Sequence, residues 1–208
     1  MHLNTSDLPY SELYAILLNS VAPRPIAWVS TVNAAGQLNL APFSFFNVVC
    51  VDPPLLAFAP GMRRRQADAH GETKDTLRNI RETREFVVNI VTYELREAMN
   101  ATSGEYDESV NEFELARLAA QPSKIVRPPR VAESPVNFEC KLYQILDFSP
   151  APTSGSLVIG QIVALHIDDA HIKDGKLDRN SLDLIGRMGG IQYTRTTQRF
   201  DMVRPKVG

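Results

Sequence analysis

Several common signatures of catalysis and metal binding are missing from this chain. It has no G-x-G-x-x-G, no P-loop and no G-x-S-x-G, so it lacks the usual signals of Rossmann-type redox chemistry, nucleotide hydrolysis and α/β-hydrolase chemistry. Its 4 histidines are not grouped at metal-ligand spacing, and no H-E-x-x-H occurs. The 2 cysteines, Cys50 and Cys140, lie far apart in apolar, strand-like settings, which predicts two buried thiols in a cytosolic protein.

An excess of one charge and long apolar runs are absent as well. The 22 lysines and arginines nearly balance the 24 aspartates and glutamates, which argues against a nucleic-acid or membrane-surface binder, because such proteins are normally basic. No apolar run reaches the roughly 18 residues that a membrane span needs, and the first residues do not resemble a signal peptide. We therefore expect residues 1–208 to form a single cytoplasmic domain with a sizeable core.

The stretch from Arg24 to Gly61 carries the strongest pattern in the chain. Residues 25–32 are β-branched and aromatic on both faces, which predicts a strand that is covered on both sides and ends in the hydroxyls of Ser30 and Thr31. A turn over residues 33–36 then predicts a hairpin.

The segment that follows, residues 41–47, interleaves three phenylalanines with polar groups. Its proline excludes a plain central strand, because proline removes an amide donor and fixes φ. Such a flat apolar surface with a few directional polar groups is typical of a pocket for a planar aromatic ligand. The candidate lining residues are Trp28, Pro42, Phe43, Ser44 and Asn47.

A second polar signal lies at Thr73, Lys74, Asp75 and Thr76, where we expect a helix over residues 74–84 to begin. A helix start has unpaired amides and a positive dipole end, so it can hold a phosphate, and Lys74 adds a full charge. An ordinary capped helix is the alternative. The arginine run at 63–65 is interpreted either as a solvated loop or as a patch beside an anionic ligand.

The remaining pattern is rich in strands. We expect a short first helix capped by Asp7 or Ser11, a buried strand at 86–91, helices at 93–101 and 111–119, and long strands at 136–148 and 157–167. His166, near a strand end, is the one titratable catalytic candidate, although a lone strand histidine is more often structural. The tail from Gly186 to Pro205 is either a flexible arm or a segment whose glycines allow close approach to a ligand or partner.

Taken in order, several of these segments resemble the flavin reductase-like, FMN-binding split-barrel family. The resemblance rests on the motifs at residues 24–31, 39–46, 52–54, 74–80, 86–90 and 186–193, and it covers nearly the whole chain. It implies a mainly β fold, an antiparallel Greek-key barrel of six or seven strands with flanking helices. It also implies bound FMN, NADH or NADPH as electron donor, a homodimer with FMN at the interface, and a flavin-dependent monooxygenase as a possible partner.

The resemblance also assigns roles to residues. It implies that the first turn at Lys74, Asp75 and Thr76 contacts the FMN phosphate and that the tail closes the pocket, with Tyr193 over the ring edge and Arg195 at a phosphate or ribityl group. Trp28, Ser30, Thr31 and the residues from Pro42 to Asn47 are the other cofactor candidates. Since hydride transfer to a flavin needs no protein nucleophile, we expect positioning residues and no catalytic dyad.

Two alternatives stay open from the sequence. One is an FMN-binding electron carrier that does not use NADH or NADPH directly. The other is a barrel with a binding role only.

Overall fold

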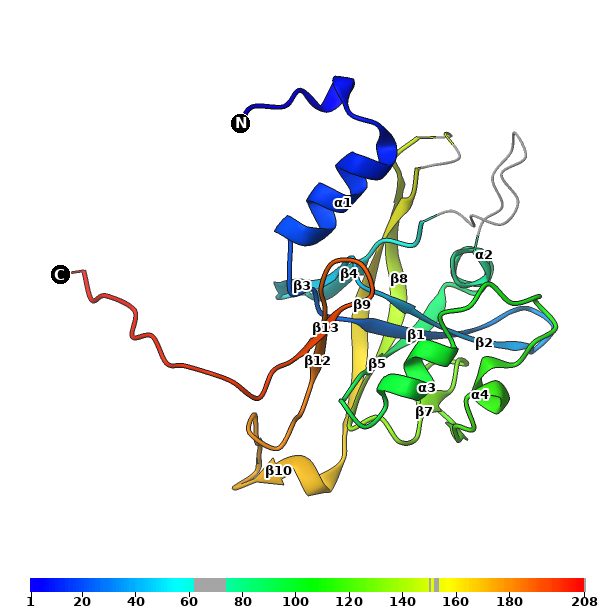
Figure 1. Ribbon diagram of the computed structural model, residues 1–208. Helices are drawn as coiled ribbons and strands as arrows, with labels where there is room; N and C mark the ends of the chain where they lie inside the picture. The colour runs from blue at the N-terminus through cyan, green and yellow to red at the C-terminus, as the bar shows by residue number, and fades with distance from the viewer. Residues whose placement is uncertain (62–73, 150, 152–153, 208) are drawn as a thin grey trace.

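The computed structural model describes residues 1–61, 74–149, 151 and 154–207, and Figure 1 shows its arrangement. The helices are η1 (Thr5–Asp7), α1 (Tyr10–Ser20), α2 (Asp75–Thr83), α3 (Arg96–Ala101), α4 (Glu112–Leu115) and η2 (Asp169–His171). The strands are β1 (Ala27–Val32), β2 (Leu38–Phe43), β3 (Phe46–Val51), β4 (Pro54–Phe58), β5 (Glu85–Ile90), β6 (Ala120–Gln121), β7 (Arg130–Val131), β8 (Val136–Asp147), β9 (Ser156–Ile167), β10 (Ile172–Lys173), β11 (Lys176–Leu177), β12 (Ile185–Arg187) and β13 (Tyr193–Arg195).

The main sheet has seven strands in the order β2-β1-β5-β8-β9-β4-β3, and every pair is antiparallel. The predicted mainly β, antiparallel fold is therefore confirmed. The predicted closed barrel is not found, because among the described strands the two end strands, β2 and β3, do not pair. The carbonyl of Phe45, in the short link between them, accepts a hydrogen bond of 2.8 Å from Ala59, which continues the pairing of β3 with β4.

One face of the curved sheet encloses an apolar core. Alternate residues of the central strands point inward, among them Val29 of β1, Val88 of β5 and Cys140 of β8. Three aromatic rings meet at its centre: Phe43 and Phe58 lie 5.1 Å apart, and Phe58 and Phe86 lie 5.5 Å apart, between ring centroids. Such pairs add about 0.5–1.5 kcal/mol each beyond their burial.

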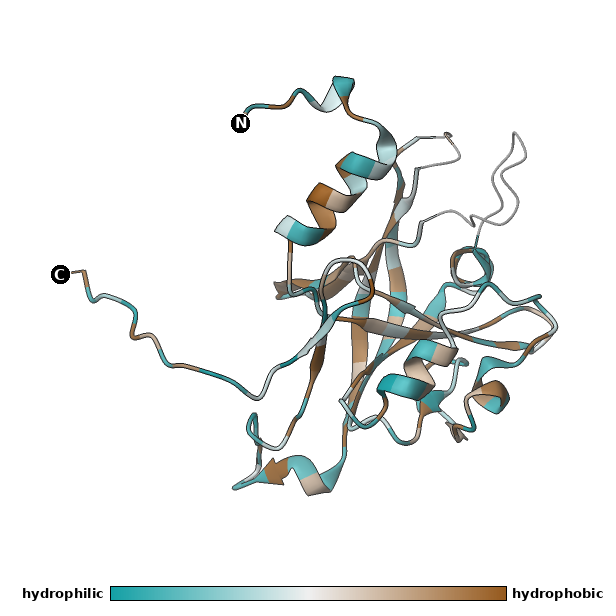
Figure 2. Cartoon of the chain, in the orientation of Figure 1, coloured by the Kyte–Doolittle hydropathy of each residue, from teal (hydrophilic) through white to brown (hydrophobic). Residues whose placement is uncertain are grey.

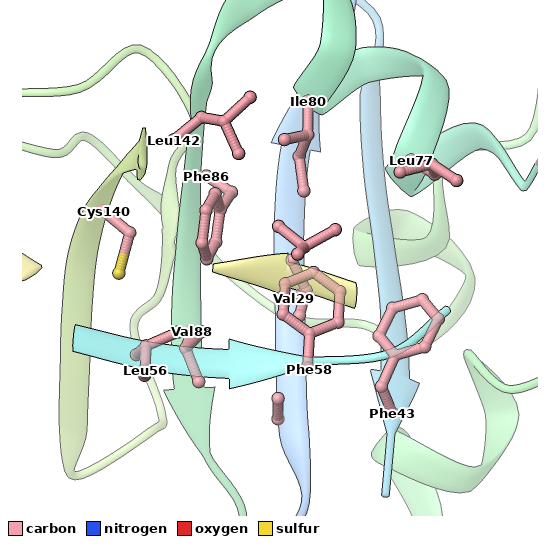
Figure 3. Close-up of a cluster of buried hydrophobic side chains, with 12 residues drawn as sticks. Val29, Phe43, Leu56, Phe58, Leu77, Ile80, Phe86, Val88, Cys140 and Leu142 are labelled. Carbon is pink, nitrogen blue, oxygen red and sulfur yellow. The ribbon is translucent and has the colours of Figure 1, made fainter. Parts of the chain in front are cut away.

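Helix α2 covers this core at one side. Figure 3 shows Ile80 reaching from the helix toward Val29 and Phe58, with Leu77 on the same helix nearer Phe43. The helix has its apolar residues at three-residue spacing, as the pattern predicts, and it ends where Arg84 takes a left-handed conformation, with φ of 65°. The expected cap, Thr73, lies outside the described residues.

The opposite face of the central strands is also covered, by α3, α4 and the connection from residue 120 to 135. Trp28, Leu40 and Phe113 form a second apolar cluster there. The prediction that the first strand is buried on both sides is confirmed, since all six residues of β1 are buried. Helices α3 and α4 are shorter than the predicted segments 93–101 and 111–119, because only the later part of the first segment and the first turn of the second are helical.

The first helix lies at the outside of the molecule. Figure 2 shows apolar and polar residues mixed along α1, and none of its residues is buried. Neither Asp7 nor Ser11 caps it: Pro9 stands at the N-cap and gives no side-chain hydrogen bond. None of the described helices is long and apolar enough to cross a membrane.

Candidate functional site

The start of α2 and the end of β2 come together at the edge of the inner core. Phe43, the last residue of β2, is buried, and the Nζ atom of Lys74 lies 5.5 Å from the centroid of its ring. This distance is within the range of a cation–π contact. The structure thus places a cation, a flat aromatic ring and a helix start beside one another.

A buried polar cluster holds this helix start against the sheet. The amide nitrogen of the Asn39 side chain donates to the hydroxyls of Thr31, at 3.1 Å, and Thr76, at 3.0 Å. Asn79 donates to the same Thr31 hydroxyl at 3.1 Å. The hydroxyls of Thr31 and Thr76 are therefore engaged inside the protein, so what α2 can offer to a ligand is its first-turn backbone amides, which have no partner within a helix.

The acidic residue of the first turn is paired within the protein. Asp75 lies 2.6 Å from a guanidinium nitrogen of Arg78, which also lies 2.9 Å from Glu108. This pairing opposes the negative charge of Asp75 beside the helix start. It removes the main electrostatic objection to an anion at Lys74 and the first-turn amides.

The turn between β2 and β3 is fastened by Arg24, which is buried. Its guanidinium donates to three backbone carbonyls, those of Leu18 at 2.7 Å, Val21 at 2.5 Å and Met188 at 2.8 Å. A fourth, longer contact of 3.5 Å runs from its Nε to the Ser44 hydroxyl. Arg24 therefore joins the end of α1, the segment after β12 and the β2–β3 turn.

Other predicted site residues lie elsewhere. Trp28 and Ser30 are on the outer face of β1, where the indole donates to Thr102 at 2.9 Å and the Ser30 hydroxyl donates to the carbonyl of Pro129 at 2.5 Å. Pro42 lies opposite Trp28 on β2. Asn47 is exposed on β3, and its side-chain oxygen accepts from the backbone of Val48. A flavin contact by these residues stays a prediction.

His166 belongs to a structural network on the outer face. Its Nε2 lies 2.5 Å from Glu139, which is fully buried and also accepts hydrogen bonds of 2.7–3.1 Å from the amides of residues 124, 125 and 126. Burial alone raises the pKa of Glu139, but these amides and His166 outweigh it and lower the pKa below its ordinary value. The pair anchors the 120–135 connection to β8 and β9.

Tyr193 and Arg195 lie on β13, in a hairpin with β12, and line a cavity of about 450 Å³ between that hairpin and α3. Arg195 binds both carboxylate oxygens of Asp183, so its guanidinium is already engaged. Gly189 approaches α1 closely, since a Cβ atom there would lie 1.8 Å from Oδ1 of Asn19, whereas the predicted approach of the paired glycines to a ligand or partner stays a prediction.

Sequence reasoning overlooked several residues of these regions. Arg24 stood between two prolines without an assigned role, Asn79 was quoted only as part of a motif, and Tyr93 and Arg187 of the cavity were not considered as site residues. The contacts that give them a place in these regions include distant ones, such as Arg24 with Met188, Asn79 with Thr31 and Tyr93 with Arg195, and no local pattern marks such contacts. The arginine run at 63–65 lies outside the described residues.

Comparison with known proteins agrees with this architecture. The flavin reductase like domain model matches residues 19–181. A protein of Aquifex aeolicus is 41% identical over 185 residues, covering 88% of this chain and 89% of that protein. This chain therefore belongs to the flavin reductase-like domain family.

Two solved structures are similar over almost their full length. One is the 2-nitrobenzoate 2-nitroreductase NbaA of Pseudomonas fluorescens, 35% identical, with a TM-score of 0.86 over 99% of this chain and 96% of that one. The other is component B of nitrilotriacetate monooxygenase from Bacillus cereus, 30% identical, with a TM-score of 0.90 over 97% and 98% of the two chains.

Proposed function

We propose that this protein binds FMN with its phosphate at the start of α2 and acts as an NAD(P)H:flavin oxidoreductase. The observation that carries the proposal is the meeting of Lys74, the first turn of α2 and the ring of Phe43 at one edge of the core. A lysine and a helix start suit a phosphate, and an aromatic edge suits a planar ring system. Membership of the flavin reductase-like family supports the same assignment.

In this proposal the protein positions its ligands on a rigid frame. Lys74 and the first-turn amides hold the phosphate, with about 1.5–3 kcal/mol for each charge-assisted contact. The Asn39–Thr31–Thr76 hydrogen bonds keep α2 in place against β1 and β2. When bound, FMN supplies the hydride acceptor.

At the start of α2 and the end of β2, the described residues are suited to positioning a ligand more than to acid–base catalysis. His166 is held by Glu139 on the opposite face of β8 and β9, and His171 by Ser181 near η2. The rate would then come from orienting the two rings within reacting distance. This fits an oxidoreductase in which the cofactor carries the chemistry.

The experiment that tests the proposal is a visible spectrum followed by an anaerobic titration. We expect the purified protein to bind FMN with a shifted flavin absorbance, and the absorbance to bleach when NADH or NADPH is added. Bound flavin that does not bleach with either donor would favour the electron carrier. No flavin binding at all would favour the barrel with a binding role only.

We also propose a homodimer. Strand β3 is an unpaired edge of the sheet, and the side chains of Phe45, Val48, Val49 and Val51 there are exposed. The residues after β13 run away from the body (Figure 1), exposing Phe200, Met202 and Val203. An exposed apolar edge and arm of this kind suit association with a second copy.

Removal of residues 200–208 tests the dimer, because it spares β13 and the hydrogen bonds of Arg199. We expect light scattering to show a dimer for the full chain and a larger fraction of monomer for the truncated chain at the same concentration. If FMN lies at the interface, its affinity falls in parallel. A truncated chain with unchanged dimer stability would contradict the role of the arm.

The partner of this activity is proposed to be a flavin-dependent monooxygenase that receives reduced flavin. The support is the likeness to nitrilotriacetate monooxygenase component B. We also propose the cytoplasm as its compartment, since Cys50 and Cys140 are both free thiols. Of these two, Cys140 is buried as predicted, but Cys50 is partly exposed at the β3 edge.

A further inference from the structure

The cavity between α3 and the β12–β13 hairpin is built from side chains on one face of that hairpin. Ile185 lies opposite Arg195 and Arg187 lies opposite Tyr193 in the antiparallel register, so all four side chains project to the same side. Helix α3 and the residues before it line the other side, and the cavity, which is partly open to solvent, has a volume of about 450 Å³. This volume is in the range of pockets that hold small organic ligands.

Arginines stacked on tyrosines form the polar part of the cavity. The guanidinium carbons of Arg96 and Arg195 lie 4.1 and 4.0 Å from the centroid of the Tyr93 ring. Arg187 lies 4.4 Å from the centroid of the Tyr193 ring. Stacking of this kind holds each guanidinium flat while its N–H groups remain directed sideways.

Two of the three arginines in the cavity lie beside a carboxylate. Asp183 neutralises Arg195 with two hydrogen bonds, and Glu97 lies 3.4 Å from Arg96. Among the described residues, no carboxylate pairs with Arg187, whose guanidinium donates to the carbonyl of Gly190. The cavity therefore has one cation without an acidic partner.

A second positive charge lies behind Arg187. The buried guanidinium of Arg24 donates to three backbone carbonyls and the Ser44 hydroxyl, and the backbones of the two arginines exchange hydrogen bonds of 2.9 and 2.8 Å. Burial lowers the pKa of Arg24, and the like charge of Arg187 lowers it further because the two cations repel each other. An anion beside Arg187 would relieve that repulsion.

The rest of the lining is mixed. Met99 of α3, Ile185 of β12 and Ile191 of the hairpin turn supply apolar groups, and Glu97, Asn100, Ser103 and Thr194 supply polar ones. Apolar groups and tyrosine rings beside an arginine without an acidic partner match a ligand with a planar aromatic body and a single negative charge. A phosphate dianion fits less well, because Asp183 and Glu97 already oppose the charges of the other two arginines.

We propose that this cavity is a binding site for a small aromatic carboxylate, with the carboxylate on Arg187 and the ring between Tyr193, Met99 and Ile185. A carboxylate can accept two parallel hydrogen bonds from one guanidinium, which gives the site its direction. The proposal does not rest on the flavin function. It concerns a region separate from Lys74 and Phe43, which do not line this cavity.

The test is calorimetric titration of the full chain with 2-naphthoate, and with the neutral 2-naphthamide as a ligand of the same shape. We expect one 2-naphthoate per chain, with an affinity at least tenfold higher than that of the amide. Arg187→Gln should weaken 2-naphthoate binding at least tenfold. The matched control is Arg127→Gln, an exposed arginine paired with Glu85, and it should leave the affinity unchanged.

A second variant and a competition experiment with FMN complete the test. Ile191 is exposed and tolerates a polar side chain, so Ile191→Glu should abolish binding by placing a carboxylate at the cavity even if Arg187→Gln fails to fold. Saturation with FMN should leave the 2-naphthoate affinity unchanged. The proposal is overturned by no binding, by equal binding of the amide, by binding that survives both substitutions, or by displacement of 2-naphthoate with FMN.

Discussion

The two faces of the central strands are equally buried but differ in what holds them together. The inner face is apolar and is packed by rings and branched side chains. The outer face carries Ser30, Asn89, Asn137 and Glu139, all buried and all hydrogen-bonded. The inner face depends on close packing, whereas the outer face depends on directional bonds that fasten a connection of irregular backbone to the sheet.

Asn89 is at the centre of the outer network. Its side chain donates to the carbonyl of Trp28 at 2.9 Å and to the hydroxyl of Ser30 at 3.3 Å, and it accepts from Val131 and Asn137, both at 2.9 Å. Every member is buried, so the loss of one leaves several polar groups without water or partner. This face should therefore be less tolerant of a single change than the inner core.

The largest predicted effect is accordingly that of Asn89→Ala. Because three or more buried partners would lose their hydrogen bond, we expect the free energy of unfolding to fall by about 3 kcal/mol or more. Urea denaturation measures this, with the neighbouring inner-face change Val88→Ala as the comparison. A loss below about 1 kcal/mol for Asn89→Ala would contradict the inference that the outer face tolerates a single change less well than the inner core.

The inner face should respond most to added volume. A Cβ atom on Gly160 of β9 would lie 2.2 Å from the ring of Phe86, which is fully buried. We expect Gly160→Ala to lower the free energy of unfolding by about 1–3 kcal/mol. The control is the pair Gly160→Ala with Phe86→Leu, whose combined cost should be less than the sum of the two, because the smaller side chain makes room. Additive costs would contradict the steric explanation.

Substitution of Lys74 tests the proposed phosphate site, which lies at the start of α2 beside the inner core. We expect Lys74→Ala to weaken FMN binding by about 1.5–3 kcal/mol, because it removes a charged donor to the phosphate. Lys141→Ala, an exposed lysine on β8, is the control and should change nothing. Fluorescence titration of FMN at low and moderate salt gives the affinities. Equal affinity in the Lys74 variant would remove this lysine from the site.

The sequence was sufficient for the long strands and for the helix that begins after Lys74, because the spacing of apolar residues along a strand or a helix is a local pattern. It placed Trp28 and Ser30 on one face and Val29 and Thr31 largely on the other, as the structure does. It could not show what covers each face. Ser30 binds Pro129, which lies 99 residues further along the chain, and no local pattern predicts such a contact.

The same limit explains the cavity and the open sheet. Tyr93 is predicted as part of a helix, yet its ring is stacked between Arg96 and Arg195, the second of which lies about a hundred residues away in the chain. The resemblance implied a closed barrel, but closure depends on whether β2 and β3 pair, and among the described strands these two end strands do not pair. Contacts between residues so far apart in the chain leave no local pattern in the sequence, so they could not be predicted from it.

The smallest predicted effect is a pH dependence of the outer face. Since the pKa of Glu139 is lower in the folded protein than its ordinary value of about 4.3, its carboxylate stabilises the fold above that value. This stabilisation is lost as the pH falls through the folded pKa, because protonation breaks the bonds to the amides of residues 124–126.

Glu139→Gln isolates this contribution. We expect the variant to be less stable than the parent at pH 6, and the difference to shrink as the pH falls below 6, because the parent progressively loses the stabilisation that its ionised carboxylate supplies. The comparison is urea unfolding at several pH values, with Glu94→Gln, an exposed glutamate, as control. A difference that stays constant with pH would mean that the ionised carboxylate is not what fastens the 120–135 connection, and the outer face would then depend on its neutral hydrogen bonds alone.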